Sequence, residues 1–402
     1  MKKYLKDYTE QVYEETQKII DKFGPRLAGD QASLDTADHI LDSFKKISDQ
    51  SEKEDFYIHQ GAFLGWIKIL VFNYALAIIF MWLNLAFISV ILLVLSLVIL
   101  VLQFFLYKPL LDMFYPKRKA SNVIGIIEPK KEVKQQIIVS GHHDSARIFN
   151  FLTHQPKLYS FRVTGSIALI IIMVVVNLLI LIFSQLEAFN LYLSIFFTFT
   201  FLLVGQMWFF ASKKGTPGAG DNLVASMVAM MVGKHFKEVE HLNHTRVIML
   251  SFDAEEEGLR GARAYVKKHK EQLKEIPTYL LNSDCLYDEK ELFFLTSDLN
   301  DFVKYDEDFI DELLEVSEVA GRFVFKQPIS FLTGGTDAAE FAKEGIKATT
   351  LIGMPWTNDN RMNSYHTPDD TLEHVNFNVV VYALDIFISY IKYKDKEVGI
   401  KK

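Results

Sequence analysis

The fold is decided by the stretch Ser251-Phe252-Asp253-Ala254-Glu255-Glu256-Glu257-Gly258-Leu259-Arg260-Gly261. An apolar, β-branched run at residues 245–250 precedes it and predicts a buried strand, and residues 262–266 begin a predicted helix. Carboxylates held together at the end of a strand resist joint ionisation, because like charges repel. A bound cation would remove that cost. The alternative is an acidic loop at a helix N-terminus, where carboxylates are favoured without any ligand.

Composition narrows the class of protein. The chain has 402 residues and a formal charge of −7, so its length suits one large domain or two ordinary ones. The mild acidity gives no reason to expect nucleic acid as a partner. The single cysteine, Cys285, excludes an intrachain disulfide and permits a reducing compartment. Residues 1–10 lack the apolar core of a signal peptide, so we expect no secretion signal there.

Two long apolar tracts predict membrane-spanning segments. Residues 66–107 carry Lys68 as their one charge, and residues 163–212 are broken only at Ser184-Gln185-Leu186-Glu187. Each tract is long enough for two helices of about 20 residues, whereas buried core helices account for apolar runs of about 10–14 residues. We therefore expect two transmembrane α-hairpins, four transmembrane helices in all, at residues 64–110 and 163–212.

The turn of the first hairpin is less clearly marked than that of the second. Only Asn84 interrupts the middle of the first tract, and neither Gly nor Pro stands at the expected turn. The boundaries of this hairpin can therefore shift by several residues. The four helices contain few charges, which indicates an anchor in the lipid bilayer, with no path for ions or substrate.

Strands alternate with helices in the rest of the chain. The expected strands lie at residues 55–63, 122–127, 136–140, 245–250, 279–284 and 348–352, and the expected helices at 9–23, 31–47, 223–236 and 375–393. This alternation predicts an α/β fold with helices on both faces of a central sheet. Ligands of such sheets bind beyond the carboxyl ends of the strands.

The soluble sequence is expected to form one domain from three pieces. These pieces are residues 1–63, 111–162 and 213–402. They can reunite as one domain because each predicted hairpin enters and leaves the membrane on the same side.

Five separated positions offer imidazole or carboxylate ligands for a metal ion. They are His142, Asp221, Glu256, Asp284 and His366. Two imidazoles combined with carboxylates suit zinc, and one shared carboxylate would allow two ions about 3.5–4 Å apart.

The motifs around these positions resemble those of the dinuclear zinc aminopeptidase family, which includes the secreted bacterial leucyl aminopeptidases and is related to glutamate carboxypeptidases and glutaminyl cyclases. They are Gly141-His142-His143-Asp144-Ser145, Gly218-Ala219-Gly220-Asp221-Asn222, Glu255-Glu256-Glu257-Gly258-Leu259-Arg260-Gly261, Asn282-Ser283-Asp284 and Tyr365-His366-Thr367-Pro368-Asp369-Asp370-Thr371. Phe23-Gly24-Pro25-Arg26-Leu27-Ala28-Gly29 is similar to the N-terminal segment of the family. Each motif is weak alone, but all occur in the order of the family.

The resemblance implies a zinc-peptidase fold with a mixed central sheet and two bound zinc ions. Asp221 would bridge the two ions. His142 and Asp284 would complete one site, and Glu256 and His366 would complete the other. The large departure from the secreted relatives is the pair of membrane hairpins that interrupts the domain.

The resemblance also implies two catalytic roles. Asp144 would orient the imidazole of His142, and Glu255 would be the general base. The three consecutive glutamates leave a question of register. Gly258-Leu259 aligns Glu255 and Glu256 with the pair of the family and leaves Glu257 as a solvated neighbour.

Four further residues stand out in the sequence but are not expected to bind metal. His143 is expected to be structural, and Cys285 is expected to form a pocket wall, because no matched base would make it a nucleophile. Asp337 stands where the family has a loop near the active site, but it is equally suited to capping a turn. Arg361 precedes His366 and is a candidate for binding a substrate carboxylate.

The leading functional hypothesis is a membrane-anchored zinc aminopeptidase that hydrolyses N-terminal residues of peptides. The alternatives are a carboxypeptidase-like or glutaminyl cyclase-like enzyme on the same scaffold, and a catalytically inactive membrane receptor or scaffold. A cyclase would need only one zinc ion. Inactive relatives typically lose metal ligands, whereas all five ligand positions are intact in this sequence. Peptide and bilayer are the expected partners, and self-association into a homo-oligomer is left open.

The expected location is a cell membrane, which the chain crosses several times, with the catalytic domain facing the cytoplasm. Lys and Arg near membrane ends favour the cytoplasmic side. These residues gather on the side of the catalytic domain, whereas the first hairpin turn has no charge and the second offers only Glu187.

Overall fold

The computed structural model describes residues 2–357 and 360–400. The chain forms two compact units. Unit 1 comprises residues 1–60, 117–148 and 214–402, and unit 2 comprises residues 61–116 and 149–213. Short strands β4 (Arg147–Phe149) and β5 (Ala211–Gly215) lie in the segments that connect the units.

Unit 1 is built around an eight-stranded mixed sheet with the order β1-β2-β6-β3-β7-β12-β8-β11. Its strands are β1 (Gln50–His59), β2 (Lys117–Ile127), β3 (Gln135–His142), β6 (Thr245–Phe252), β7 (Thr278–Leu286), β8 (Leu292–Leu295), β11 (Phe325–Gln327) and β12 (Lys347–Gly353). The four central strands β6, β3, β7 and β12 run parallel to one another. Every residue of β3 is buried, as expected for a parallel strand that is covered on both faces.

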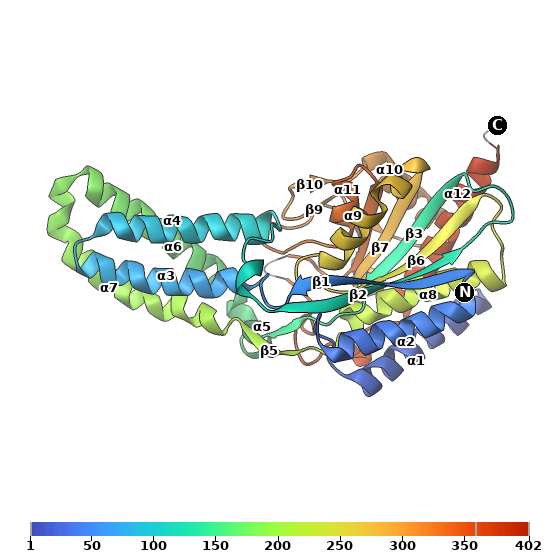
Figure 1. Ribbon diagram of the computed structural model, residues 1–402, viewed down its shortest axis with the longest axis horizontal. Coiled ribbons are helices and arrows are strands. Elements are labelled where there is room, and N and C mark those ends of the chain that lie inside the picture. The colour runs from blue at the N-terminus through green and yellow to red at the C-terminus, as the bar shows by residue number, and fades with distance from the viewer. Residues whose placement is uncertain (1, 358–359, 401–402) are drawn as a thin grey trace. The chain divides into compact units, whose positions relative to one another are not determined.

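Helices cover both faces of this sheet. Figure 1 shows α1 (Lys3–Phe23), α2 (Gln31–Ile47) and α8 (Val224–Glu238) on one face, and α9 (Arg260–Glu275) and α11 (Ala338–Ala342) on the other. Helix α12 (Phe377–Ile400) packs against α8 and α1, and α10 (Glu307–Val319) packs against α12. The predicted α/β fold with a mixed central sheet and helices on both faces is confirmed.

The first strand differs from its predicted range. We expected it at residues 55–63, but β1 spans Gln50–His59. The whole strand, including its charged first half, pairs along β2, from Gln50 opposite Ile126 to His59 opposite Lys117. A strand near the sheet edge tolerates charged side chains on its exposed face, and therefore its hydrophobic pattern is weak.

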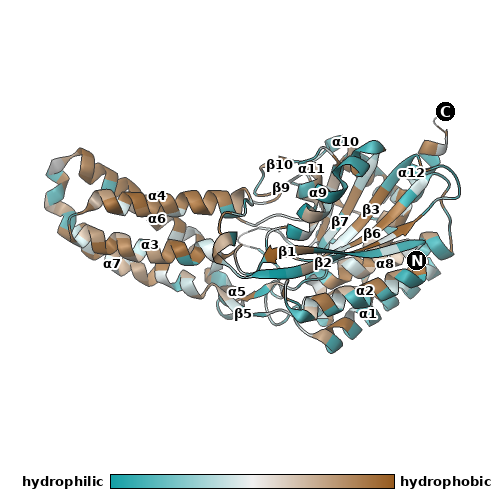
Figure 2. Ribbon diagram, viewed as in Figure 1, coloured by the Kyte–Doolittle hydropathy of each residue, from teal (hydrophilic) through white to brown (hydrophobic). Residues whose placement is uncertain are grey.

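Unit 2 contains four long apolar helical segments. They are Gly65–Trp82, Ala86–Phe105, Pro156–Ile182 and Gln185–Phe209, with mean hydropathies of 1.7, 3.0, 3.0 and 1.8. Their α-helical cores are α3 (Gly65–Trp82), α4 (Ala86–Leu100), α6 (Tyr159–Ile182) and α7 (Asn190–Val204), and α5 (Asn150–His154) precedes α6. Figure 2 shows these helices as predominantly hydrophobic. Each is long and apolar enough to cross a membrane.

Apolar side chains cover the outer surface of unit 2. Phe72 and Leu202 are more than half exposed. Polar side chains face inward instead: Asn73 donates to Ser96 Oγ at 3.0 Å, and the hydroxyls of Tyr74 and Thr200 are 2.7 Å apart. An apolar outside with internally satisfied polar groups suits a lipid environment.

Asn84 forms the turn of the first hairpin. Helix α3 ends at Trp82 and α4 begins at Ala86, and Asn84 between them has a φ of 58°. Asn tolerates this left-handed conformation better than most residues, because its short polar side chain bonds locally. The hairpin therefore turns without Gly or Pro.

Candidate metal centre

Three neighbouring strands deliver the first group of site residues. His142 is the last residue of β3, and Asp284 lies near the end of β7. Glu255 and Glu256 follow the end of β6 at Phe252. Because β3 pairs in parallel with both β6 and β7, the three carboxyl ends meet at one edge of the sheet.

Two loops deliver the remaining residues. Asp221 precedes α8, and its neighbour Asn222 donates through Nδ2 to the carbonyl of Ser283 at 3.0 Å. His366 lies between β12 and α12. Asp370, four residues later, accepts from the backbone N–H of Gly220 at 2.9 Å, which ties the loop of His366 to the loop of Asp221.

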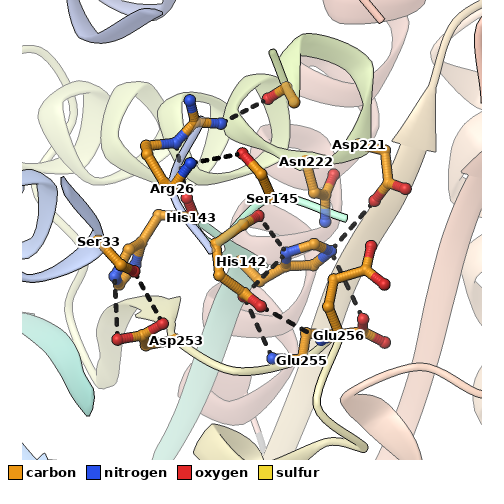
Figure 3. Close-up of polar contacts among 12 residues, drawn as sticks. Arg26, Ser33, His142, His143, Ser145, Asp221, Asn222, Asp253, Glu255 and Glu256 are labelled. Atoms are coloured by element: carbon orange, nitrogen blue, oxygen red, sulfur yellow. Dashed lines mark hydrogen bonds and ion pairs between the residues drawn. The ribbon is translucent and has the colours of Figure 1, made fainter. Parts of the chain in front are cut away.

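Asp221 presents one carboxylate oxygen to each of two imidazoles. Oδ1 is 3.2 Å from His142 Nε2, and Oδ2 is 3.0 Å from His366 Nε2. His366 Nε2 is also 3.2 Å from Glu256 Oε1, and His142 Nε2 is 4.0 Å from Asp284 Oδ1. Figure 3 shows His142, Asp221 and Glu256 converging on one region.

Ligand atoms of the five predicted residues fall into two overlapping groups. His142, Asp221 and Asp284 form one, and Asp221, Glu256 and His366 form the other, with the ligand atoms of each group within 4.8 Å of one another. Asp221 belongs to both groups. The structure therefore brings together all five residues in the pairing that the family resemblance implies, and their roles as ligands stay a prediction.

The donor atoms fit a metal centre. Within residues 2–357 and 360–400, the buried atoms His142 Nε2, Asp221 Oδ2 and Asp284 Oδ1 make no hydrogen bond, although imidazole nitrogens lie within ion-pair distance of both carboxylates. Buried polar atoms are almost always satisfied, so this convergence needs a partner from outside the chain. Imidazole and carboxylate donors with this spacing suit zinc.

The pKa shifts of the site residues also indicate that the cluster needs a positively charged partner. Burial lowers the pKa of His366, but Glu256 and Asp221 outweigh it and raise that pKa to about 9. Burial raises the pKa of Asp284 to about 7, with repulsion from Asp221 adding to it and His142 opposing it. Burial likewise raises the pKa of Glu255 well above its usual value. Divalent cations would favour ionised carboxylates and neutral imidazoles.

Asp144 connects the His142 strand to the acidic turn. Its carboxylate accepts the backbone N–H of Glu255 at 3.1 Å and of Glu256 at 3.2 Å. His142 Nδ1 lies 3.3 Å from Asp144 Oδ1. The backbone carbonyl oxygen of Asp144 is 3.2 Å from the same Nδ1. A proton on Nδ1 would therefore be held by Asp144 and leave the Nε2 lone pair toward Asp221, which is the arrangement typical of a metal-binding imidazole.

Left-handed backbone conformations surround the centre. Ala254, Cys285 and His366 have φ values of 62°, 51° and 54°. For residues other than glycine, such a conformation costs about 1–2 kcal/mol. The first two residues adjoin Glu255 and Asp284, and the third is itself a site residue, so the packed sheet holds this strain where the site side chains are aimed.

Arg26 is a supporting residue whose role the sequence did not reveal. Its side chain is fully buried and donates to the carbonyl oxygens of Gly24, His143, Pro217 and Gly218. Figure 3 shows it beside Ser145, whose Oγ accepts its backbone N–H. Burial lowers the pKa of Arg26 to about 10, so it stays charged near neutral pH. Arg26 thereby joins the N-terminal segment to the loops that carry His142 and Asp221.

One expectation about carboxylates is wrong, and one alternative that the sequence left open is decided. Glu257 is 8% exposed, so it is not a solvated neighbour, because the turn after β6 directs it toward Arg147, whose Nη2 is 3.7 Å from its Oε1. Asp337 does not cap a turn. It precedes α11, but its side chain makes no capping hydrogen bond and is 1% exposed.

The other secondary residues lie outside the two ligand groups. His143 Nδ1 is 2.9 Å from Ser251 Oγ, and burial lowers the pKa of His143 to about 3, which suits a structural role. The buried thiol of Cys285 has a raised pKa, caused first by burial, so it is a poor nucleophile. Arg361 donates to the carbonyl of Thr357 at 3.0 Å and lies 5.4 Å from the ring centroid of Tyr365.

Comparisons with known proteins agree with this geometry. The sequence model of peptidase family M28 matches residues 207–391, which contain four of the five predicted ligands. A zinc aminopeptidase from Bacillus subtilis is 15% identical, with a TM-score of 0.58, and the match covers 96% of this chain and 94% of that one. A glutaminyl cyclase from an Acidobacteriales bacterium is 16% identical, with a TM-score of 0.56 and coverages of 97% and 95%.

A leucine aminopeptidase precursor from Bacteroides thetaiotaomicron is 11% identical, with a TM-score of 0.58 and coverages of 95% and 96%. A comparison with proteins of curated function gives no match. The predicted resemblance to zinc aminopeptidases and glutaminyl cyclases is confirmed. The family match supports a metallopeptidase, and the structural neighbours share its zinc-peptidase fold.

Proposed function

Because the chain matches the zinc-dependent peptidase family M28 over residues 207–391, we propose that it is a membrane-anchored aminopeptidase with two zinc ions. One observation carries the proposal: Asp221 directs one oxygen to the His142 group and the other to the His366 group. A carboxylate shared in this way is the element that a two-ion site requires.

The chain's own residues divide the work of peptide hydrolysis. His142 and Asp284 would hold one ion, Glu256 and His366 the other, and Asp221 both. When bound, the two ions would polarise the scissile carbonyl and lower the pKa of water. Glu255 would accept a proton from the attacking water and return it to the leaving amine.

The position of Glu255 supports this proposed proton transfer. Its Oε2 is 3.9 Å from His142 Nε2, and its ligand atom lies within 4.8 Å of those of His142 and Glu256, so the carboxylate borders the cluster. Asp144 fixes its backbone through the hydrogen bond to the N–H of Glu255. A base held in this way is oriented before substrate arrives.

An aminopeptidase is favoured over the alternatives by the completeness of the cluster. A cyclase would need one ion, whereas both ligand groups are present. A carboxypeptidase would need a cationic site for the substrate carboxylate. Arg361, the candidate for that role, engages Thr357 and Tyr365. An inactive receptor gives no reason for five intact ligands to converge.

Hydrolysis of blocked and free peptides tests this function. Aminoacyl reporter peptides with a free N-terminus should be cleaved, and their N-acetylated counterparts should not, because the free amine is the recognition handle of an aminopeptidase. Equal cleavage of both forms would indicate an endopeptidase. Cyclisation of an N-terminal glutamine without hydrolysis would indicate a cyclase.

The four apolar helices would anchor the enzyme in a cell membrane as a multi-pass protein. Their length, composition and exposed apolar side chains support this role. The charges at the helix ends support a catalytic unit that faces the cytoplasm. The expected partners are a peptide and the lipid bilayer.

A further inference from the structure

The hydroxyl of Tyr287 is linked to the loop of Asp221 through one buried carboxylate. It donates to Asp370 Oδ1 at 2.9 Å, and the same oxygen accepts the backbone N–H of Gly220 at 2.9 Å. The backbone carbonyl oxygen of Asp370 also accepts the N–H of Ala219 at 3.1 Å. Tyr287 and Asp370 are fully buried, so these hydrogen bonds lie in a medium of low dielectric and are stronger than they would be in water.

The ring of Tyr287 packs directly on the backbone of Gly220. A Cβ added at residue 220 would overlap this ring, so any larger residue would push the ring and the loop apart. Glycine is therefore required at this position for close approach. The loop of Asp221 thus contacts both the ring of Tyr287 and, through Asp370, its hydroxyl.

The backbone of Tyr287 is hydrogen-bonded on both sides. Its N–H donates to the carbonyl of Gly353 at 3.0 Å, and its carbonyl accepts the N–H of Asn376 at 2.7 Å. Gly353 is the last residue of β12, and Asn376 directly precedes α12. The side chain of Tyr287 therefore starts from a point that is fixed to the central sheet.

Tyr287 and Asp370 connect three of the segments that carry proposed ligands. Tyr287 lies three residues beyond Asp284, and Asp370 lies four residues beyond His366. The carboxylate of Asp370 accepts the N–H of the residue that precedes Asp221. The hydrogen bond between the tyrosine hydroxyl and the carboxylate therefore restrains the relative positions of two carboxylates and one imidazole of the cluster.

We propose that Tyr287 is a positioning residue of the metal centre, which acts through Asp370 and holds Asp221 where it reaches both ligand groups. This inference rests on the proposed function, because it concerns zinc binding, and deepens it by assigning a residue outside the ligand set. Asp221 presents one oxygen to each group, so a displacement of its loop would affect both ions. Loss of an outer partner of metal ligands typically lowers metal affinity by about 10- to 100-fold.

Zinc affinity tests the proposal without relying on turnover. The full chain in detergent is titrated with zinc in competition with a chelator of known affinity. Tyr287→Phe keeps the ring on Gly220 and removes only the hydroxyl, so the affinities for both zinc ions should fall by about 10-fold. With Co²⁺ in place of zinc, the visible spectrum of Tyr287→Phe should differ from that of wild type, because the geometry of the ligands changes.

The matched control is Tyr305→Phe. Tyr305 is also buried and donates to a buried carboxylate of unit 1, Asp298, which lies in β9 (Ser297–Asp298), a strand that carries none of the five proposed ligands. Each variant loses one buried hydrogen bond, so the Tm of metal-free protein should fall by a similar amount in both. Only Tyr287→Phe should lose zinc affinity. Wild-type zinc affinity in Tyr287→Phe, or an equal loss in Tyr305→Phe, would overturn the proposal.

Variants of Asp370 test whether Tyr287 acts through it. Zinc affinity should fall in Asp370→Ala, and adding Tyr287→Phe should lower it little further, because both changes remove the same connection. Equal effects of Tyr287→Phe in the two backgrounds would overturn the proposal. Asp370→Asn keeps an oxygen that can accept from Tyr287 and Gly220, so it should bind zinc more tightly than Asp370→Ala. This comparison decides the question if Tyr287→Phe does not fold, and equal affinities of the two Asp370 variants would then overturn the proposal.

The outcomes separate this inference from the proposed function. If wild type binds two zinc ions, with the predicted loss in Tyr287→Phe, but hydrolyses no peptide, the aminopeptidase assignment fails and the role of Tyr287 stands. If wild type hydrolyses only free peptides and Tyr287→Phe binds zinc like wild type, the function stands and the role of Tyr287 fails. Wild type that binds no zinc would overturn both.

Discussion

The carboxylate of Asp144 lies 3.3 Å from Nδ1 of His142 and also accepts the backbone N–H groups of Glu255 and Glu256. The backbone carbonyl oxygen of Asp144 is 3.2 Å from the same Nδ1, so this one residue contacts a proposed ligand at the end of β3 and also holds the turn after β6. The segments are joined by pairing of their strands and again by this carboxylate. The proposed base and the proposed ligand are thus positioned by the same group.

Replacing Asp144 should lower activity without removing the fold. In Asp144→Asn, the single amide oxygen cannot accept both backbone N–H groups as the two carboxylate oxygens do. The imidazole of His142 also loses the negative charge beside its Nδ1. We expect kcat/KM or zinc affinity to fall by about 10- to 100-fold. Kinetics at saturating zinc, with a competition assay for zinc affinity, would measure both. Wild-type values for both would show that Asp144 does not position the centre.

Replacing Glu255 should remove turnover and leave zinc in place. Glu255→Gln cannot accept a proton, so the rate should fall by about 10²- to 10⁴-fold. Asp221→Ala should instead lose zinc, because Asp221 belongs to both ligand groups.

The matched control for Glu255→Gln is Glu257→Gln, which alters the neighbouring carboxylate paired with Arg147. It should retain most of the activity. If Glu257→Gln is the inactive variant and Glu255→Gln is active, the register of the three glutamates is wrong.

The stability of zinc-free protein should fall as pH rises. The pKa of His366 is raised from 6.5 to about 9, because Glu256 and Asp221 outweigh the lowering by burial, and burial raises that of Asp284 from 3.8 to about 7. A raised pKa stabilises the folded state below the unfolded value and loses this effect as pH passes the folded value. The window therefore runs from about pH 4 to pH 9.

Thermal unfolding with and without a chelator would test this pH dependence. The Tm of chelated protein should decrease between pH 5 and pH 9. Zinc should raise the Tm more at high pH, because its ligands must lose protons to bind it. A zinc-induced gain in Tm that is the same at every pH would contradict this pH dependence. As a control, the Tm of Asp221→Ala should increase little on addition of zinc at any pH.

Much of the fold follows from hydrophobic patterning. The predicted helix at 31–47 is α2, and the predicted strands at 245–250 and 279–284 lie within β6 and β7. These elements carry strong apolar signals because both faces of the sheet are covered. Strands β8 and β11 were not predicted, since runs of three or four residues carry too little periodicity to distinguish them.

The site residues that escaped prediction depend on tertiary contacts. Arg26 receives its role from carbonyl oxygens near residues 24, 143 and 217, which no local pattern relates to one another. The sequence could not decide between two roles for Asp337, because a turn cap and a site residue look alike until the partners of the carboxylate are known. The buried position of Glu257 likewise depends on Arg147.

The orientation in the membrane is predicted by charge. Positive residues lie near the helix ends on the catalytic side: Lys68, Lys108, Lys117, Arg118, Lys119, Lys157, Arg162, Lys213 and Lys214. Glu187→Cys, at the opposite turn, should react with a membrane-impermeant thiol reagent added to intact cells. The native Cys285 is 1% exposed and should add little background.

Lys131→Cys, at an exposed position of unit 1, is the matched control for labelling. It should react only after the cells are lysed. A silent Glu187→Cys together with labelled Lys131→Cys in intact cells would place the catalytic unit outside the cytoplasm.

The number of zinc ions per chain tests the central claim most directly. Protein purified in detergent, dialysed against zinc and freed of excess metal would be analysed for zinc and for protein by independent methods. The shared position of Asp221 between the His142 and His366 groups predicts two zinc ions per chain. One ion, or none, would contradict the two-ion site.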